Sequence, residues 1–287
     1  MKQNFPLQMI REKSKMFQVP YENMLIGCAK ERLLDSIIKN TSGNSAIVFS
    51  AVVGYGIERY RCSKDKTIEI KLLNNGLNDE TYDFLEEAIL GTGESRLDGQ
   101  WKIRQETEAE IEVLVPFDKV KLSILVHIEV SPAQKGSIQV VSLPICYEND
   151  QYLEIPCFYP EAELAEAFLG CWERMELLQD LSKLEYIYLM GKRFSLDGRR
   201  ISEYLEYYFM ENGLTFSKER SNQVFACVKN AYLKKRWKAY LSTEKRNSPS
   251  WEDVMGTICN MYEPVISLLC EQEIFFGDWM PAVGRYL

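Results

Sequence analysis

Carboxylates that could hold a metal ion lie on one predicted strand early in the chain. In the segment 61–72, RCSKDKTIEIKL, polar and apolar residues alternate from Thr67 onward. Because successive side chains of a strand point to opposite faces, Asp65 and Glu69 share a polar face with Thr67. Carboxylate oxygens on one face suit Mg²⁺, which phosphoryl transfer uses to hold phosphates. The solvated face of a half-buried strand is the alternative reading of the same pattern.

A second predicted strand, 120–130, carries another acidic candidate. Its alternating pattern places Glu129 and His127 on one polar face. His127 is the only histidine in the chain, so catalytic triads and zinc sites built on several imidazoles have little support. Any chemistry is therefore based on carboxylates, with His127 as a candidate base. A solvent-facing strand glutamate beside an idle histidine is the alternative.

Composition narrows the class of protein. The chain has 287 residues, 46% hydrophobic content and a formal net charge of -8. This length and content suffice for a large core in one or two domains, and the acidic total argues against a surface coated generally by nucleic acid. No apolar run approaches bilayer length and no signal-peptide core opens the sequence, so we expect a cytoplasmic protein without a membrane partner. The eight cysteines include no C-x-x-C pair, which favours reduced core residues.

One basic run stands out against this acidic total. The segment 221–241 has the spacing of a single helix, with Ala231 and Tyr232 among the residues expected inward. Its basic residues alternate with aromatic ones and could contact tRNA or another phosphate backbone. A solvated helix face is the more common explanation of such a run. The basic residues are Lys229, Lys234, Lys235, Arg236 and Lys238.

The strongest helical pattern begins at Glu161. An apolar stripe with a spacing of three or four residues runs along this helix, and most of its glutamates, Glu163 among them, are expected off the stripe. A second helical segment contains 182–186, SKLEY, and leads to the loop 194–198, FSLDG, where Asp197 is expected to cap the next helix. The stripe consists of Leu164, Phe168, Cys171, Met175 and Leu178.

The order and spacing of these segments resemble the AbiEii/AbiGii toxin family, nucleotidyltransferase-fold proteins of bacterial abortive-infection and toxin–antitoxin systems. In that family a Glu-Lys pair, a K-D-x-x-D box and an F-x-x-D-G loop follow one another. Here Glu166-Ala167, 182–186 and 194–198 stand at those places. The loop matches, whereas Lys183 and Tyr186 stand at the two aspartates of the box. The resemblance extends from about residue 10 to residue 264.

The resemblance also assigns roles to the polar residues of the predicted sheet. The family's R-x-[ST]-x-D-x-D strand corresponds to the segment from Arg61, with Thr67 in place of the second aspartate. Glu69 lies one strand period further, roughly 7 Å away, and would serve only if the metal site moved. The resemblance thus implies Asp65, Glu69 and Glu129 as catalytic residues, with Asp65 and Glu129 as metal ligands. The nucleotide-binding residues it implies are Ser50 at the family's Lys-Gly-Gly turn, Ser63, Lys64 and Lys183.

The fold that we expect is α/β (α+β), with a nucleotidyltransferase-like mixed β-sheet flanked by helices and followed by a helical domain. Residues 1–45 would form helices that pack on the core, 46–157 the nucleotidyltransferase-like domain and 158–287 the helical domain. Active members of the family use a nucleoside triphosphate (NTP) with Mg²⁺, modify tRNA and are encoded beside a winged-helix antitoxin. These properties are implied by the resemblance alone.

Three functions follow as hypotheses. The leading one is a catalytically degenerate AbiEii-like protein, without a cofactor, retained as a binding or regulatory component of a bacterial defence or toxin–antitoxin locus. The alternative is an active magnesium-dependent nucleotidyltransferase that transfers from an NTP to tRNA or protein through a rearranged site of Asp65, Glu69 and Glu129. The third is a nucleic-acid-binding module built on the basic run.

Overall fold

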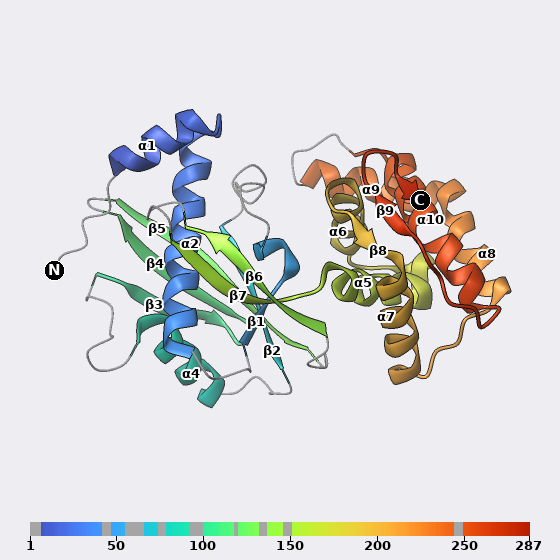
Figure 1. Ribbon diagram of the computed structural model, residues 1–287, viewed down its shortest axis with the longest axis horizontal. Helices are drawn as coiled ribbons and strands as arrows, with labels where there is room; N and C mark the ends of the chain where they lie inside the picture. Colours follow the sequence, from blue (N-terminus) through green and yellow to red (C-terminus); the bar gives the residue numbers. More distant parts are fainter. Residues whose placement is uncertain are drawn as a thin grey trace. The chain divides into compact units, whose positions relative to one another are not determined.

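The computed structural model describes residues 7–41, 47–54, 66–73, 79–91, 100–117, 120–131, 137–145, 151–243 and 249–287. The chain divides into two compact units, Met1–Tyr159 and Pro160–Leu287 (Figure 1). The expected mixed sheet flanked by helices, followed by a helical part, is confirmed.

The first unit contains a mixed sheet. In the described residues the strand order is β3-β4-β5-β2-β1-β7-β6. The pairs β2/β5 and β1/β7 are parallel, and the other neighbours are antiparallel. The strands are β1 (Ile47–Phe49), β2 (Thr67–Leu73), β3 (Lys102–Thr107), β4 (Glu110–Phe117), β5 (Val120–Ser131), β6 (Ile138–Pro144) and β7 (Tyr152–Phe158).

The alternation of residues 101–115 predicts one continuous strand, whereas the structure has two. A turn at Glu108 and Ala109 divides it into β3 and β4, which pair with each other. The Ala109 N–H donates to Thr107 Oγ1 at 3.3 Å. This local bond is the kind by which threonine side chains favour turns over continuous strands.

Helices bury one face of this sheet. They are α1 (Leu7–Met16), α2 (Tyr21–Thr41) and α4 (Asp79–Leu90), and a short 3-10 turn, η1 (Ala51–Gly54), follows β1. Ile37 of α2 and Leu85 of α4 belong to one buried core with Ile68 and Ile70 of β2, and α2 crosses the sheet in Figure 1. The apolar face of β2 is therefore buried as predicted, which leaves its polar side chains on the other face.

The second unit is mainly helical. It contains α5 (Pro160–Arg174), η4 (Met175–Leu177), α6 (Ser182–Arg193), α7 (Gly198–Glu211), α8 (Lys218–Ala226), η5 (Cys227–Lys229), α9 (Ala231–Thr243) and α10 (Trp251–Leu269). We expected only helices here, but β8 (Leu196–Asp197), β9 (Asp278–Met280) and β10 (Arg285–Tyr286) form a small sheet in the order β10-β9-β8.

The predicted apolar stripe is confirmed, because all five of its residues are buried. Glu163, which we expected off the stripe, is also buried, at 5% exposed. The reason is that α5 packs against α6, α7 and α8, so that little of its surface reaches solvent.

The single helix predicted over 221–241 is wrong. It is divided into α8, η5 and α9 around Asn230, whose side chain accepts from the N–H groups of Tyr232 and Leu233 at 3.0 and 3.1 Å. Asparagine side chains stabilise new helix starts in this way. The restart changes which residues face inward: Tyr232 is 62% exposed, while Leu233 and Trp237 are buried.

The chain's thiols and apolar segments are distributed through the fold. Cys62 and Cys146 lie outside the described residues, and the other six cysteines carry free thiols. Burial raises the pKa of the Cys171 thiol to about 12.

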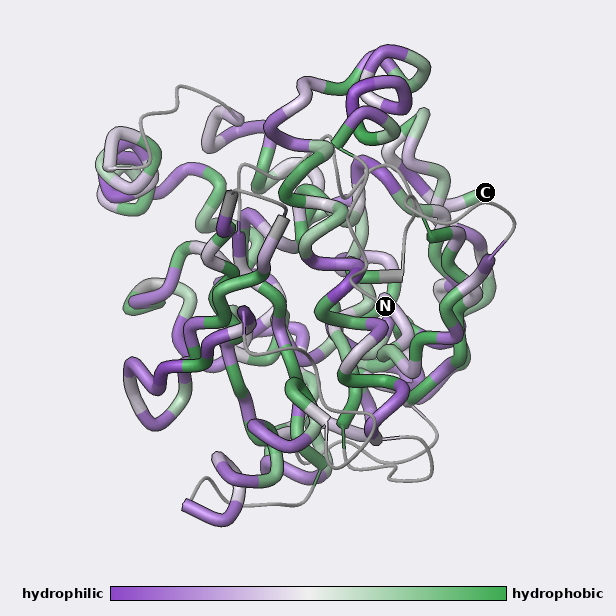
Figure 2. Tube along the Cα trace, turned by 90° about the vertical axis from the view of Figure 1, so that its left-hand side faces the viewer, coloured by the Kyte–Doolittle hydropathy of each residue, from purple (hydrophilic) through white to green (hydrophobic). Residues whose placement is uncertain are grey.

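Hydrophobic and hydrophilic residues are interspersed along the chain (Figure 2), and in the described ranges no helix combines the length and apolar character needed to cross a bilayer.

The glycine of the FSLDG loop lies where backbone and ring approach closely. A Cβ at Gly198 would stand 2.5 Å from the Gly277 carbonyl oxygen and 2.6 Å from Phe275 Cε1. The Gly198 N–H donates to the Gly277 carbonyl at 2.9 Å. This position therefore requires glycine for the loop to meet the C-terminal strands.

We predict that Gly198→Ala lowers the free energy of unfolding by about 1–3 kcal/mol, because backbone and ring must move apart. Urea unfolding followed by tryptophan fluorescence measures the change. Gly256→Ala is the matched control, since no described heavy atom lies within 4 Å of its Cβ position in α10. It should stabilise by about 0.5–1 kcal/mol through helix propensity. Equal effects of both changes would contradict the close-contact explanation.

Candidate functional site

Polar side chains from β2 and β5 lie together on the sheet face opposite the buried core. The parallel register aligns Glu69 with His127 and Lys71 with Glu129. Glu69 and Glu129 are diagonal neighbours, which strand spacing and rise place roughly 8 Å apart at Cα. On the adjacent β4, Glu110 Oε1 lies 3.8 Å from His127 Nδ1. The structure thus brings together Glu69, Glu129 and His127, whereas the alternation predicted only the face of each strand on which they lie.

Lys71 lies in the middle of this patch, and the sequence patterns did not single it out. Its side chain is only 10% exposed, and Nζ lies 3.6 Å from Glu129 Oε2. The ammonium also lies 5.3 Å from the centre of the Phe158 ring. The available signal was the alternation of β2, which puts Lys71 on the same face as Glu69. A buried ammonium is therefore the partner of the proposed metal ligand.

This ion pair changes what Glu129 can bind. Magnesium is held by several oxygen ligands, and carboxylates supply most of the protein's share. A fixed positive charge beside Glu129 already satisfies part of its charge and repels a second cation. Among the residues that the structure describes, no group of three or more His, Cys, Asp or Glu side chains could hold a metal ion. The Lys71 ammonium therefore competes with a metal cation for the Glu129 carboxylate.

Several predicted site residues cannot be placed with this patch. Asp65, Ser63 and Lys64 lie outside the described residues. Ser50, at the end of β1, is 2% exposed, and Ala51 after it is fully buried. The Ser50 carbonyl accepts from the Val53 N–H at 3.0 Å, which forms the first turn of η1. The turn that resembles a phosphate-binding loop therefore directs its first residues into the protein.

In the helical unit, residues of the segment at the K-D-x-x-D positions form hydrogen bonds to neighbouring helices. The Tyr186 hydroxyl donates to the Glu163 carboxylate, which connects α6 to α5. The Tyr240 hydroxyl donates to Glu185 Oε2 at 2.7 Å, which connects α9 to α6. Lys183, proposed to bind nucleotide, is exposed on α6. These bonds between helices give the segment 182–186 a structural role.

The FSLDG loop is held by a buried glutamate that the sequence patterns also missed. Glu161 Oε1 accepts from the Asp197 N–H at 2.9 Å. Burial raises the pKa of Glu161, while its bond to the Asp197 backbone and the charge of Arg200 act in the opposite direction. Asp197 in turn caps α7 by accepting from the Arg199 and Arg200 N–H groups at 2.9 and 3.3 Å. The cap is the role predicted for Asp197.

The basic run divides into paired and exposed residues. Lys234 forms an ion pair with Glu252. Arg236 donates to the Gln179 carbonyl at 3.3 Å and lies over the Tyr232 ring. The exposed lysines of η5 and α9 make no ion pair within the described ranges and form the exposed lysine set: Lys229, Lys235 and Lys238.

Comparison with known proteins gives similarity of structure only. No protein-family model matches the chain. No curated protein matches it. JHP933 from Helicobacter pylori has a similar structure, with a TM-score of 0.45 and 12% identity over 84% of this chain and 92% of that one. A candidate nucleotidyltransferase from H. pylori is similar with a TM-score of 0.44 and 11% identity over 85% and 96% of the two chains.

We predict unequal effects when the two partners of the ion pair are removed separately. Glu129→Gln leaves a buried ammonium without its carboxylate and should lower the free energy of unfolding by up to about 1 kcal/mol, since Glu129 itself is half exposed. Lys71→Met leaves a glutamate that water can solvate and should be neutral or stabilising by about 1 kcal/mol. Urea unfolding followed by circular dichroism measures both. A larger loss for Lys71→Met would contradict the assigned burial.

Proposed function

We propose that this chain is a catalytically degenerate protein of nucleotidyltransferase type that acts as a binding or regulatory component of a bacterial defence or toxin–antitoxin locus. The observation that supports it best is the buried ammonium of Lys71 beside Glu129. An active site for phosphoryl transfer must concentrate positive charge on the triphosphate through a metal held by carboxylates. Here the Lys71 ammonium lies beside Glu129, one of the two carboxylates proposed to bind the metal.

The helical unit supports the same proposal. Tyr186 stands where the resembling family has an aspartate, and it bonds to Glu163. Glu185, in the same segment, accepts a hydrogen bond from the Tyr240 hydroxyl. Loss of one interaction that stabilises the transition state typically costs a hundredfold or more in rate. Several such losses together leave a scaffold that is suited to binding.

An active transferase with a rearranged site is the second candidate. It is favoured by the shared face of Glu69, Glu129 and His127, which could accept a proton from an attacking hydroxyl. In this candidate function the Lys71 ammonium would leave Glu129 and pair with a phosphate of the substrate instead. Binding of nucleotide, with and without Mg²⁺, separates the two candidates.

We predict that the purified chain binds ATP, CTP and GTP no more tightly in the presence of Mg²⁺ than in its absence, because Glu129 is paired with Lys71. Isothermal titration calorimetry in matched buffers, with and without EDTA, measures this. Asp65→Ala should leave the titrations unchanged. Magnesium-dependent binding that is abolished by Asp65→Ala would contradict degeneracy and support the active transferase.

The proposed locus implies a partner protein. The resembling family is encoded beside a winged-helix antitoxin, so the adjacent reading frame provides an inexpensive test of context. An adjacent winged-helix gene whose product copurifies with this chain would support the proposal. Copurification tests the proposal whether or not the chain binds nucleotide, because a catalytically degenerate protein needs only to bind its partner.

Binding of tRNA is a separate candidate activity, supported by the exposed lysine set. Each phosphate contact made by a lysine releases counterions, so each contact steepens the decrease of affinity with salt. The set lies on η5 and α9, and none of its lysines forms an ion pair within the described residues, while Lys238 is an electrostatic neighbour of Glu252. The paired residue Lys234 provides an internal comparison.

We predict that Lys235→Gln combined with Lys238→Gln weakens tRNA binding and lowers the slope of log K against log salt by about 0.7–0.9 per lysine. Fluorescence anisotropy with labelled tRNA at several salt concentrations measures the slope. Lys234→Gln is the matched control and should change the slope less, because Lys234 is paired with Glu252. Absent binding, or binding insensitive to salt, would rule out this face.

A further inference from the structure

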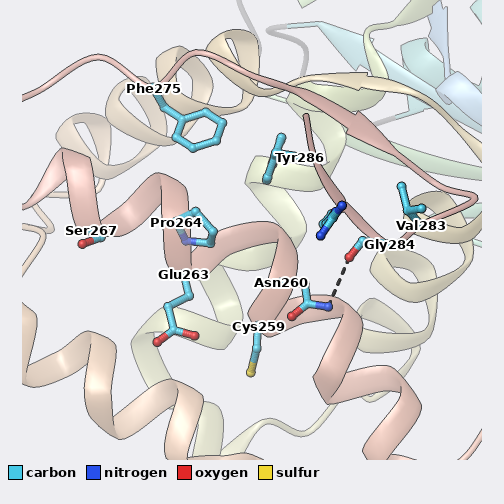
Figure 3. Close-up of a pocket in the computed structure, with 10 residues that line it drawn as sticks. Cys259, Asn260, Glu263, Pro264, Ser267, Phe275, Val283, Gly284 and Tyr286 are labelled. Carbon is cyan, nitrogen blue, oxygen red and sulfur yellow. Dashed lines mark hydrogen bonds between the residues drawn. The ribbon is translucent and has the colours of Figure 1, made fainter.

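In the described residues four strands lie at sheet edges, β3 and β6 in the large sheet and β8 and β10 in the small one. An edge strand presents backbone groups that can pair with a further strand. Both edges of the small sheet meet side chains of their own unit. The Asp197 N–H of β8 donates to Glu161 Oε1 at 2.9 Å. The Gly284 carbonyl, beside β10, accepts from the Asn260 amide of α10 at 3.1 Å (Figure 3).

The β3 edge of the large sheet is protected by charge. Lys102, Arg104 and Glu106 alternate along this strand, and all three are exposed. Arg104 forms ion pairs with Glu106 at 2.5 Å and with Glu112 of β4 at 3.1 Å. Charged side chains on an edge strand discourage pairing with a second copy, because like charges would meet across the new seam.

The β6 edge, on the opposite side of the large sheet, is not protected in this way. Its seven residues, IQVVSLP, include no charged side chain, and proline stands only at the end, as Pro144. Val140 in the middle of the strand is 64% exposed. Leu143 is buried and Val141 packs against the core of the unit, so the inner face fixes the strand to the sheet. The result is an anchored strand with an uncharged edge.

The register of β6 on β7 determines which backbone groups point outward. The Tyr159 N–H donates to the Ser137 carbonyl at 2.9 Å, and the Ile145 N–H donates to the Gln151 carbonyl at 3.0 Å. Because bonded and non-bonded pairs alternate in an antiparallel ladder, the odd-numbered residues of β6 bond to β7. The even-numbered residues point away from β7, and no hydrogen bond from another described residue reaches their backbone groups. They are Ile138, Val140 and Ser142, with the carbonyl of Pro144 at the end of the row.

We propose that β6 pairs antiparallel with β6 of a second copy of this chain, which joins the two large sheets into one. A strand paired with itself about a two-fold axis matches donors to acceptors by symmetry, because both copies use the same surface. Centred on Val141, the pairing overlaps all seven residues and places Val140 opposite Ser142 of the other copy. Every outward N–H then meets a carbonyl, and no like charges meet along the seam.

Sedimentation equilibrium of the full chain from about 1 to 500 μM tests the proposal, since so small an interface is expected to give a micromolar affinity. The wild type should show a reversible equilibrium between monomer and dimer. Val140→Pro removes an outward N–H that β7 does not use and should weaken the dimer about tenfold or more. Val140→Thr is the matched control, because it keeps the N–H and a β-branched side chain, and it should dimerise like the wild type.

A charged variant tests the same seam without changing the backbone. Val140→Lys places two ammonium groups diagonally across the two-fold axis and should also weaken the dimer, more so at low salt. Circular dichroism of each variant checks that the fold is kept. A chain that stays monomeric over the whole concentration range would overturn the proposal, and so would a dimer that Val140→Lys leaves unchanged. A chain that is monomeric alone but pairs β6 with a strand of a different protein would also overturn it.

Discussion

The candidate site depends on the parallel register between β2 and β5. That register places the Lys71 ammonium beside the Glu129 carboxylate and Glu69 beside His127. A shift of one residue would move every side chain of β2 to the other face and bury Glu69 against α2 and α4. The buried isoleucines of β2 therefore fix the register, and the register fixes which charges meet. Whether this face can hold a metal is thus a consequence of packing on the opposite face.

The alternation of β2 and β5 could be read from the sequence, but their pairing could not. Periodicity gave the polar and apolar face of each strand, and both are confirmed by the burial of Ile68 and Ile128. Pairing is different, because it joins segments that lie far apart in the chain, and alternation carries no information about which residues become neighbours. Lys71 was visible as a polar-face residue, whereas its burial against Phe158 depends on contact with β7.

The helical unit shows the same limit in another form. The apolar stripe of α5 was predictable, since one helix determines its own periodicity. Burial of Glu161 and Glu163 was not, because their partners come from elsewhere in the unit: the Asp197 N–H of the FSLDG loop and the Tyr186 hydroxyl of α6. Glutamate on a helix is ordinarily a surface residue. A buried one requires a donor whose position only the assembled fold determines.

The small sheet joins two features that the sequence presented as unrelated. Leu196 of the FSLDG loop pairs with Trp279 in β9, and β10 forms the other edge of the same sheet. Trp279 is fully buried, and its indole N–H donates to the Gly191 carbonyl at 2.7 Å. Burial, followed by the charge of Glu161, raises the pKa of Tyr286 above its usual range. The glutamate that holds the loop is therefore an electrostatic neighbour of Tyr286 on β10. A loop that resembles part of an enzyme family is fixed here as one edge of a three-stranded sheet.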